Sequence, residues 1–294
     1  MTSTKKDDDE FVNILSKYDL IFLYETWTSS KSNVELSGYT AHTFYRQFEH
    51  RNARRYSDGL VLYYKDSLKD GISIVKNQYD TIIWVKLDAV FFKLDTDVYI
   101  CGTYLWGETS PVYNIVNVEL FDALETDVTY FQTYGSVYVM GDLNSRVGLR
   151  NDCVIHGENK SFTDDAVYVP DTPLLRASSD SLCNRFGIKL LDLCKPTSVR
   201  IFNGRLGDDH SVCAYTYLSH QGASVIDYVL AKERDFTRVC NFDIGKLTEW
   251  SDHVPVKLSL SCIVKCTDNI PEREYKYKWS NERRHDANEQ TLTV

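Results

Sequence analysis

Apolar residues near the start of the chain fall first at helical spacing and then in a continuous run. Phe11, Ile14, Leu15 and Tyr18 recur at intervals of three and four, which predicts a short helix. The run at 20–24 predicts a buried strand. By the same pattern, further strands are predicted at 60–64, 81–87, 98–104, 136–140, 215–218, 225–230 and 256–260.

Two longer segments each have one apolar helical face. These faces consist of Val116, Leu120, Leu124 and Phe131, and of Leu182, Phe186, Leu190 and Leu191. Strands alternate with these helices but also follow one another in hairpin-like runs. That mixture favours an α/β sandwich of mixed sheets over a purely parallel sheet.

Polar stretches divide the chain. Residues 150–176 are rich in Asp, Asn, Thr, Ser and Pro, which predicts a long surface loop that helps to shape a substrate cleft. From Thr267 onward the sequence is polar and charged. We therefore expect a polar N-terminal segment at 1–10, one domain at 11–264, and a polar tail or linker at 265–294.

Composition indicates a folded chain that is neither secreted nor embedded in a membrane. The 294 residues are 43% hydrophobic and include 20 Tyr, 13 Phe and 5 Trp, enough to build a large core. No apolar run approaches the roughly 20 residues that span a bilayer. The N-terminus is charged and acidic, unlike a signal peptide.

The eight cysteines are scattered, and no pair has the spacing of a zinc knuckle. Cys262 and Cys266 lie four apart, but no partner pair follows at ligand spacing. Several cysteines lie in apolar segments, where a reduced thiol behaves as a small hydrophobic group. We expect an intracellular, reducing compartment.

The net charge of -9 argues against binding nucleic acid through a broadly basic surface. It does not exclude a nuclease, because part of the acidity would belong to a metal site. A local cluster of arginines interleaved with aromatic residues offers a contact for backbone phosphates, and a solvated loop is the alternative interpretation. The arginines are Arg46, Arg51, Arg54 and Arg55.

Three apolar segments adjoin polar signatures that suit phosphate-ester chemistry. They are Gly141-Asp142-Leu143-Asn144, Ser224-Val225-Ile226-Asp227-Tyr228 and Ser251-Asp252-His253-Val254-Pro255. A carboxylate at the end of a buried strand is held rigidly, and a histidine oriented by a carboxylate can donate to a phosphate oxygen. Taken alone, Asp142 would be a turn residue and Asp252 a loop or cap residue. Together they predict one site, and its crowded negative charge requires a metal.

With Glu25-Thr26-Trp27 added, the order of these motifs resembles the endonuclease/exonuclease/phosphatase superfamily, which includes abasic-site endonucleases and DNase I. The chain is most similar to the endonuclease domain of non-LTR (LINE-type) retrotransposons, over about residues 19–260. The resemblance implies a four-layer α/β sandwich of two mixed β-sheets flanked by helices. The segment from Tyr275 to Trp279 resembles the start of the linker toward reverse transcriptase in such elements.

The resemblance also implies how a metal and a water molecule are held. Glu25 would bind Mg²⁺, with Mn²⁺ as an alternative, because hard cations prefer carboxylate oxygens, and Asp252 would lie by the metal or by the leaving oxygen. Asp142 would orient or deprotonate the attacking water. Asn144 would hold the water or a phosphate oxygen, on the same side as Asp142 if the strand continues.

Further residues would contact the phosphate and the DNA. His253 would stabilise the developing charge on the scissile phosphate while Asp227 bonds its other ring nitrogen. Tyr104 matches a tyrosine that donates to the phosphate, although it would otherwise be an ordinary strand aromatic. The expected contacts to the DNA backbone are Arg146, Thr216 and Ser224.

The chain departs from the family pattern in two places. The family has an early central strand that ends in an Asn, within a segment such as Trp-Asn-Val-Asn-Gly-Leu, and residues 1–10 hold nothing comparable. We therefore expect neighbouring strands with unpaired backbone groups, each costing about 1 to 3 kcal/mol if buried, and weakened activity. The second departure is Asp58 before Gly59, where the family often has two glycines; this makes the turn before Leu60 uncertain.

The leading hypothesis is a Mg²⁺-dependent DNA endonuclease of retrotransposon origin that hydrolyses a phosphodiester by in-line attack of water. Its partner is DNA, with no membrane or obligate protein partner expected, and access to the nucleus follows if genomic DNA is the substrate. One alternative is a catalytically degenerate remnant or binding module. Another is a phosphatase or phosphodiesterase of the same fold, because this fold hosts several activities.

Overall fold

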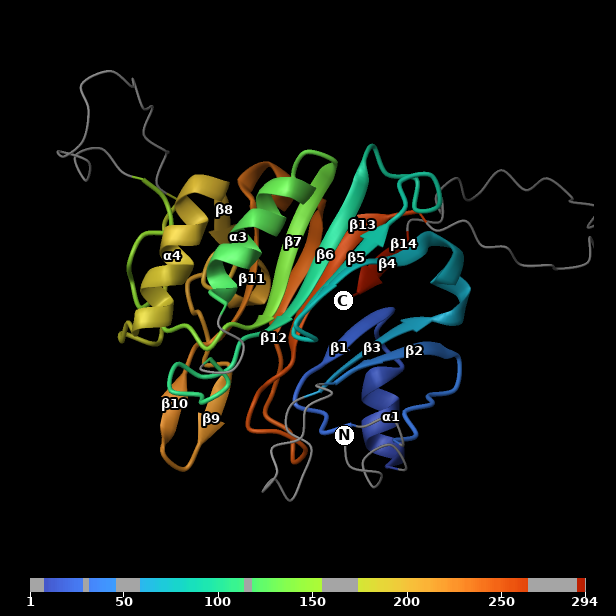
Figure 1. Cartoon of the computed structure of the whole chain (residues 1–294), viewed down its shortest axis with the longest axis horizontal. Coiled ribbons are helices and arrows are strands. Elements are labelled where there is room, and N and C mark those ends of the chain that lie inside the picture. Colours follow the sequence, from blue (N-terminus) through green and yellow to red (C-terminus); the bar gives the residue numbers. More distant parts are fainter. Residues whose placement is uncertain are drawn as a thin grey trace, which may run out of the picture.

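The computed structural model describes residues 8–28, 32–45, 59–113, 118–154, 174–263 and 290–293. Its elements are shown in Figure 1. In chain order they are α1 (Asp9–Leu15), β1 (Leu20–Leu23), β2 (Tyr39–Phe44), β3 (Leu60–Lys65), η1 (Asp66–Gly71), β4 (Ile72–Gln78), β5 (Ile82–Leu87), β6 (Asp97–Tyr104), α3 (Leu120–Phe131), β7 (Gly135–Asp142), α4 (Arg185–Thr197), β8 (Val199–Ile201), η2 (Gly207–Asp209), β9 (Tyr217–Ser219), β10 (Gly222–Ser224), β11 (Asp227–Lys232), η3 (Glu233–Arg238), β12 (Val239–Ile244), β13 (Val256–Cys262) and β14 (Gln290–Thr293).

Most of the described strands form two layers, and β9 and β10 pair separately as an antiparallel hairpin. A six-stranded sheet has the order β4-β5-β6-β7-β11-β8, in which β6 and β7 are parallel and the other neighbours are antiparallel. The second layer consists of two antiparallel three-stranded sheets, β1-β3-β2 and β12-β13-β14. Figure 1 shows α3 and α4 beside β7, β11 and β8, and α1 beside β1 and β3. The predicted α/β sandwich is confirmed.

Alternating side chains along the central strands build two separate cores. In β5, Trp84 faces α3 and α4, whereas Ile83 and Val85 face the second layer. Leu62 of β3 and Leu258 of β13 pack in that same inner core. A third cluster lies under α1, where Leu15 meets Ile21, Val61 and Tyr63. Both three-stranded sheets therefore cover the same face of the central sheet.

Every apolar segment predicted as a strand contains one, although the bounds of the strands shift by a few residues. The strands that the pattern missed, such as β2 and β4, lack a long apolar run because only part of each is buried. The second helix begins at Arg185, with Asn184 as its N-cap, so the prediction for Leu182 was wrong. Leu182 lies before the helix and is 57% exposed. Val116 lies outside the described residues.

Among the described strands, the second layer is divided into two separate sheets. Among the described strands, β1 pairs only with β3. Residues 256–258 of β13 pair only with β12, residues 259 and 260 pair with both β12 and β14, and residues 261 and 262 pair only with β14. The last strand therefore comes from the segment that we expected to be a polar tail, and that expectation was wrong for Gln290–Thr293.

Gly59 directly precedes β3, and Asp58 lies outside the described residues. The φ angle of Gly59 is +97°, which favours glycine, and a Cβ there would lie 2.9 Å from Thr26 Oγ1. The Gly59 carbonyl accepts a hydrogen bond of 3.1 Å from the Thr26 amide. Gly59 therefore supports the segment that carries Glu25.

No helix within the described ranges is both long and apolar enough to cross a membrane.

Candidate active site

Three of the predicted site residues occupy one row across the central sheet. Tyr104 at the end of β6 lies opposite Asp142 at the end of β7, and Asp142 lies opposite Asp227 at the start of β11. Directly opposed residues project to the same side of a sheet, where like charges repel each other. The strand register therefore places two buried carboxylates together, and a positive charge is needed beside them.

Asn144 holds the Asp142 carboxylate rather than extending the strand. Its backbone amide donates to Asp142 Oδ1 at 2.8 Å, and its side-chain amide donates to Asp142 Oδ2 at 3.1 Å and to the Leu105 carbonyl at 2.7 Å. Because β7 ends at Asp142 and Asn144 has a φ of +47°, a tight turn brings the two side chains together. Strand alternation, which we had expected to do so, is not the cause.

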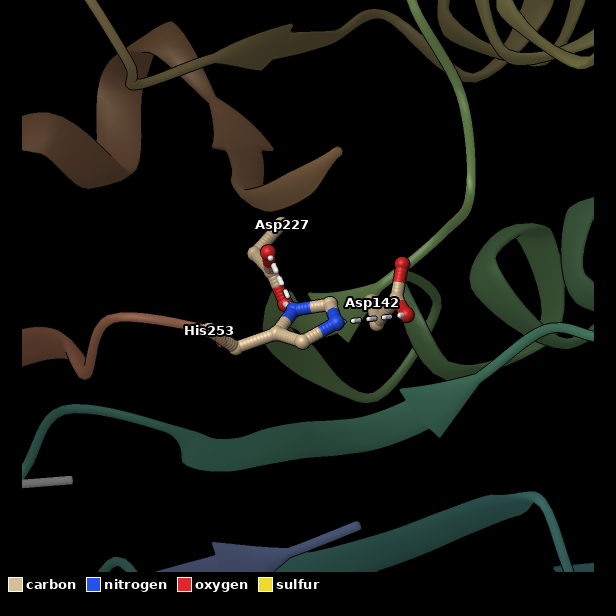
Figure 2. Close-up of side chains that lie close together, drawn as sticks. All are labelled: Asp142, Asp227 and His253. Atoms are coloured by element: carbon tan, nitrogen blue, oxygen red, sulfur yellow. Dashed lines mark hydrogen bonds and ion pairs between the residues drawn. The ribbon is translucent and has the colours of Figure 1, made fainter. Parts of the chain in front are cut away.

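His253 lies between the two carboxylates (Figure 2). Its Nδ1 is 3.0 and 3.1 Å from the two carboxylate oxygens of Asp227, and since a carboxylate only accepts, Nδ1–H is the donor. Its Nε2 is 3.9 Å from Asp142 Oδ2. Ligand atoms from Asp142, Asp227 and His253 all lie within 4.8 Å of one another. Residues distant in sequence thus converge on one site.

The electrostatics of this group follow from burial and crowding. Burial raises the pKa of Asp142 well above its ordinary value, and the charge of Asp227 raises it further. Burial alone would lower the pKa of His253, but the hydrogen bond and charge of Asp227, with the charge of Asp142, raise that pKa to about 9. At neutral pH the imidazole is therefore a cation that can donate from both nitrogens.

This pKa shift predicts a pH-dependent stability. The pKa of His253 rises from 6.5 to about 9 on folding, so its stabilising contribution is complete below about pH 6.5 and is lost as the pH rises through about 9. We expect the melting temperature of metal-free protein to fall over that interval. Calorimetry of wild type and His253→Gln isolates the contribution of His253. Identical pH profiles for the two proteins would contradict the assignment.

The remaining predicted residues of the site surround one cavity of about 1070 Å³. Glu25 follows β1, has a φ of +49°, and is exposed. The Tyr104 hydroxyl donates to Glu25 Oε1 at 2.5 Å, so in this structure it orients a carboxylate. Asp252 is exposed and lines the same cavity beside His253. Glu25 and Asp252 are not members of the close group formed by Asp142, Asp227 and His253.

The donor set fits a hard divalent cation. Carboxylate oxygens from Glu25, Asp142, Asp227 and Asp252 line the cavity, whereas no cysteine does among its described lining residues. Burial, and after it the charges of Asp227 and Glu25, raise the pKa of Asp142, so its ionised form is disfavoured in this site. A bound cation would relieve the repulsion among these carboxylates.

The residues predicted to contact DNA differ in their position and exposure. Arg146 lines the cavity, but its guanidinium forms two hydrogen bonds of 2.7 and 2.6 Å with Asp180. Thr216 is 0% exposed, so no part of its hydroxyl reaches solvent. Ser224 is buried at the end of β10 and lines the cavity. The four clustered arginines, Arg46, Arg51, Arg54 and Arg55, lie outside the described residues.

Two residues that the sequence analysis overlooked support the loop after β7. Asp180 accepts from Arg146 and from the Val225 amide, which lies two residues before Asp227. Asn184 accepts from the Arg146 amide at 2.9 Å and donates to the Asn144 carbonyl at 3.0 Å. Asn184 could have been found as an N-cap before an apolar helical face. Asp180 had no comparable signal.

Comparisons with known proteins place this geometry in context. A model described as "Endonuclease/Exonuclease/phosphatase family" matches residues 2–253. No curated protein sequence matches the chain.

Solved structures share the fold at low sequence identity. An AP endonuclease from Leishmania major has a TM-score of 0.57 and 14% identity, covering 83% of this chain and 79% of that one. A 3' phosphatase from Neisseria, bound to a product DNA hairpin, has a TM-score of 0.51 and 16% identity, with coverage of 84% and 91%. A 3'-5' exonuclease from Neisseria meningitidis has a TM-score of 0.51 and 15% identity, also with coverage of 84% and 91%.

Proposed function

Since this chain belongs to the endonuclease/exonuclease/phosphatase family, whose members are hydrolytic nucleases and phosphatases, we propose that it is a Mg²⁺-dependent DNA endonuclease. The observation that carries the proposal is the convergence of Asp142, Asp227 and His253 at one cavity. A carboxylate base beside a carboxylate-bound imidazolium suits the hydrolysis of a phosphodiester by in-line attack of water. The solved AP endonuclease with the same fold favours DNA as the substrate class.

Each residue of the site has a distinct task in this reaction. Asp142 takes a proton from the attacking water, and its raised pKa makes the ionised carboxylate a stronger base. Asn144 holds that carboxylate in place through two hydrogen bonds. The Nε2–H of His253 donates to a non-bridging phosphate oxygen as negative charge develops, while Asp227 fixes the ring.

The metal would be held by carboxylates of the same cavity, with Glu25 and Asp252 as the first candidates. When bound, Mg²⁺ supplies Lewis-acid stabilisation of charge on the phosphate and the leaving oxygen. Tyr104 orients Glu25 through its hydroxyl and thereby shapes this binding site.

Origin and location belong to the same proposal. The order of the motifs resembles that of LINE-type retrotransposon endonucleases, and we propose that origin for this chain. Cys101, Cys194 and Cys213 are free thiols buried in the core, which supports an intracellular reducing compartment. Access to the nucleus would follow from action on genomic DNA.

Nicking of supercoiled plasmid tests the function directly. We expect conversion to the open-circular form with Mg²⁺ or Mn²⁺, and none with a chelator. The nicked ends should accept extension by a polymerase if the product has a 3'-hydroxyl. Equal rates with and without chelator would contradict the metal requirement.

Replacing Glu25 by Gln should weaken the response to metal. One ligand charge is lost, and we expect the Mg²⁺ concentration for half-maximal nicking to rise by about 10-fold to 100-fold, by analogy with the loss of groups that support a metal site. Excess Mg²⁺ should restore much of the rate. Titration calorimetry and nicking rates measure this effect, and Glu35→Gln is the control because Glu35 is an exposed acid outside the cavity lining. An unchanged Mg²⁺ dependence in Glu25→Gln would remove Glu25 from the metal site.

Hydrolysis of a terminal phosphate is the second candidate activity. It is favoured by the neisserial 3' phosphatase, which has the same fold. DNA duplexes ending in 3'-phosphate, incubated beside intact supercoiled plasmid, separate the two activities. Release of inorganic phosphate without nicking would make the phosphatase the better assignment.

A further inference from the structure

Thr216 lies at a junction behind the active site. Its side chain is 0% exposed, and its Oγ1 accepts hydrogen bonds of 3.0 Å from the backbone amides of both Ile226 and Asp227. Asp227 is the first residue of β11, so the Thr216 hydroxyl holds the start of this strand, at the site residue itself. Because both donors are buried, removing their acceptor would leave two backbone N–H groups unsatisfied.

The backbone of Thr216 connects to the loop that carries His253. Its carbonyl accepts from the Val254 amide at 2.8 Å, and its amide donates to the Ser224 carbonyl at 3.0 Å. The next residue, Tyr217, forms an isolated β-bridge with His253 itself. Thr216 therefore links the segment that holds Asp227 to the segment that holds His253, through four hydrogen bonds of the same residue.

We propose that Thr216 is a positioning residue that sets the distance and orientation between Asp227 and His253. This inference rests on the proposed function, in which that pair stabilises the phosphate. The Nδ1 of His253 is 3.0 Å from its nearest oxygen on Asp227, so a small shift of β11 would break the contact. A misplacement of about 1 Å at a catalytic group can cost about 10²-fold in rate.

This role differs from the DNA contact implied by the family resemblance. A contact residue must present its hydroxyl to the phosphate backbone, but the hydroxyl of Thr216 is buried and already bonded to two amides. Loss of a DNA contact would weaken binding and raise KM. Loss of a positioning residue would instead lower kcat and leave KM almost unchanged.

The test compares Thr216→Val with Thr216→Ser. Valine keeps the shape but removes the acceptor oxygen, whereas serine keeps the oxygen and removes one methyl group. We expect Thr216→Val to lower kcat for nicking by about 10-fold to 100-fold, with KM for DNA within about 2-fold of wild type. Thr216→Ser should retain kcat within about 3-fold. A rise in KM with unchanged kcat in Thr216→Val would overturn the proposal in favour of a DNA contact.

Thr197→Val is the matched control for losing a buried threonine hydroxyl. Thr197 is buried in α4, where its Oγ1 donates to the Leu193 carbonyl, and it does not line the cavity. Thermal melts show whether each variant is folded at the assay temperature. An equal loss of kcat in both valine variants would mean that general destabilisation is responsible, and would overturn the proposal.

A readout independent of activity separates this inference from the proposed function. The hydrogen-bonded Nδ1–H of His253 should give a downfield proton resonance at fixed pH, identified by its loss in His253→Gln. We expect that resonance to shift or broaden in Thr216→Val and to persist in Thr216→Ser and Thr197→Val. This pattern in a protein that nicks no DNA would support Thr216 while rejecting the endonuclease. An unchanged resonance in Thr216→Val would overturn the inference.

Discussion

Replacing Asp142 by Asn is expected to lower the rate of DNA nicking by about 10³-fold, the middle of the range for removing a general base. Asn has nearly the same shape, and its amide oxygen can still accept the Asn144 backbone N–H, although its NH₂ group cannot replace Oδ2 as the acceptor for the Asn144 side chain. It cannot take a proton from water. The loss of rate therefore reports mainly the missing base, since the shape and one of the two hydrogen bonds from Asn144 are kept.

Although Asp142→Asn should lower the nicking rate, it should not lower the stability of the protein. Burial and the nearby charge of Asp227 raise the pKa of Asp142, which means that the ionised form is disfavoured in the folded protein. A neutral amide removes that penalty, so the melting temperature of metal-free protein should be unchanged or higher.

Single-turnover nicking at saturating DNA and Mg²⁺ measures the rate, and calorimetry measures the melting temperature. Asp122→Asn is the control, because Asp122 is an exposed acid of α3 and its loss makes the same change in charge away from the cavity. A nicking rate for Asp142→Asn within about 3-fold of wild type would remove Asp142 from the general-base role, since even the low end of that range is about 10²-fold.

Replacing His253 by Ala should have the next largest effect, a loss of about 10²-fold to 10³-fold in nicking rate. The imidazolium is the one positive group in the close set of Asp142, Asp227 and His253, and its Nε2–H is the donor assigned to the phosphate. Without it, negative charge on the phosphate develops beside two carboxylates. The effect should fall on kcat, because the interaction strengthens as charge develops.

His253→Ala should also be less stable than wild type. Asp227 would remain buried without the partner that now donates to both of its oxygens, and an unpaired buried polar group costs about 1 to 3 kcal/mol. Urea denaturation measures that cost, and His210→Ala is the control because His210 is exposed and outside the cavity lining. Full nicking activity in folded His253→Ala would contradict the proposed phosphate contact.

The success of the strand predictions has a local cause. Segments such as 82–87 and 98–104 are buried on both faces, so their residues are nearly all apolar and can be recognised without knowing their partners. The strand at 39–44 is only half-buried throughout, and its mixed composition could not distinguish it from a loop. Prediction therefore failed mainly where burial was incomplete.

The site residues show a similar division. Asp142, Asp227 and His253 could be proposed because each lies where an apolar segment meets a polar signature. Nothing local could show that Arg146 is bonded to Asp180, 34 positions away, or that Thr216 is buried. Those two residues were predicted to contact DNA because their side chains are polar. Only the tertiary structure shows that they form hydrogen bonds within the protein.

The sequence by itself determined which segments are apolar enough to become central strands and helices, and which acids and histidine stand at their ends. The tertiary structure alone decided the register that puts Tyr104, Asp142 and Asp227 in one row, and the approach of His253 to two carboxylates. The physical reason is range: hydrophobicity and turn preference act between near neighbours, whereas strand register and pKa depend on residues that only packing brings together.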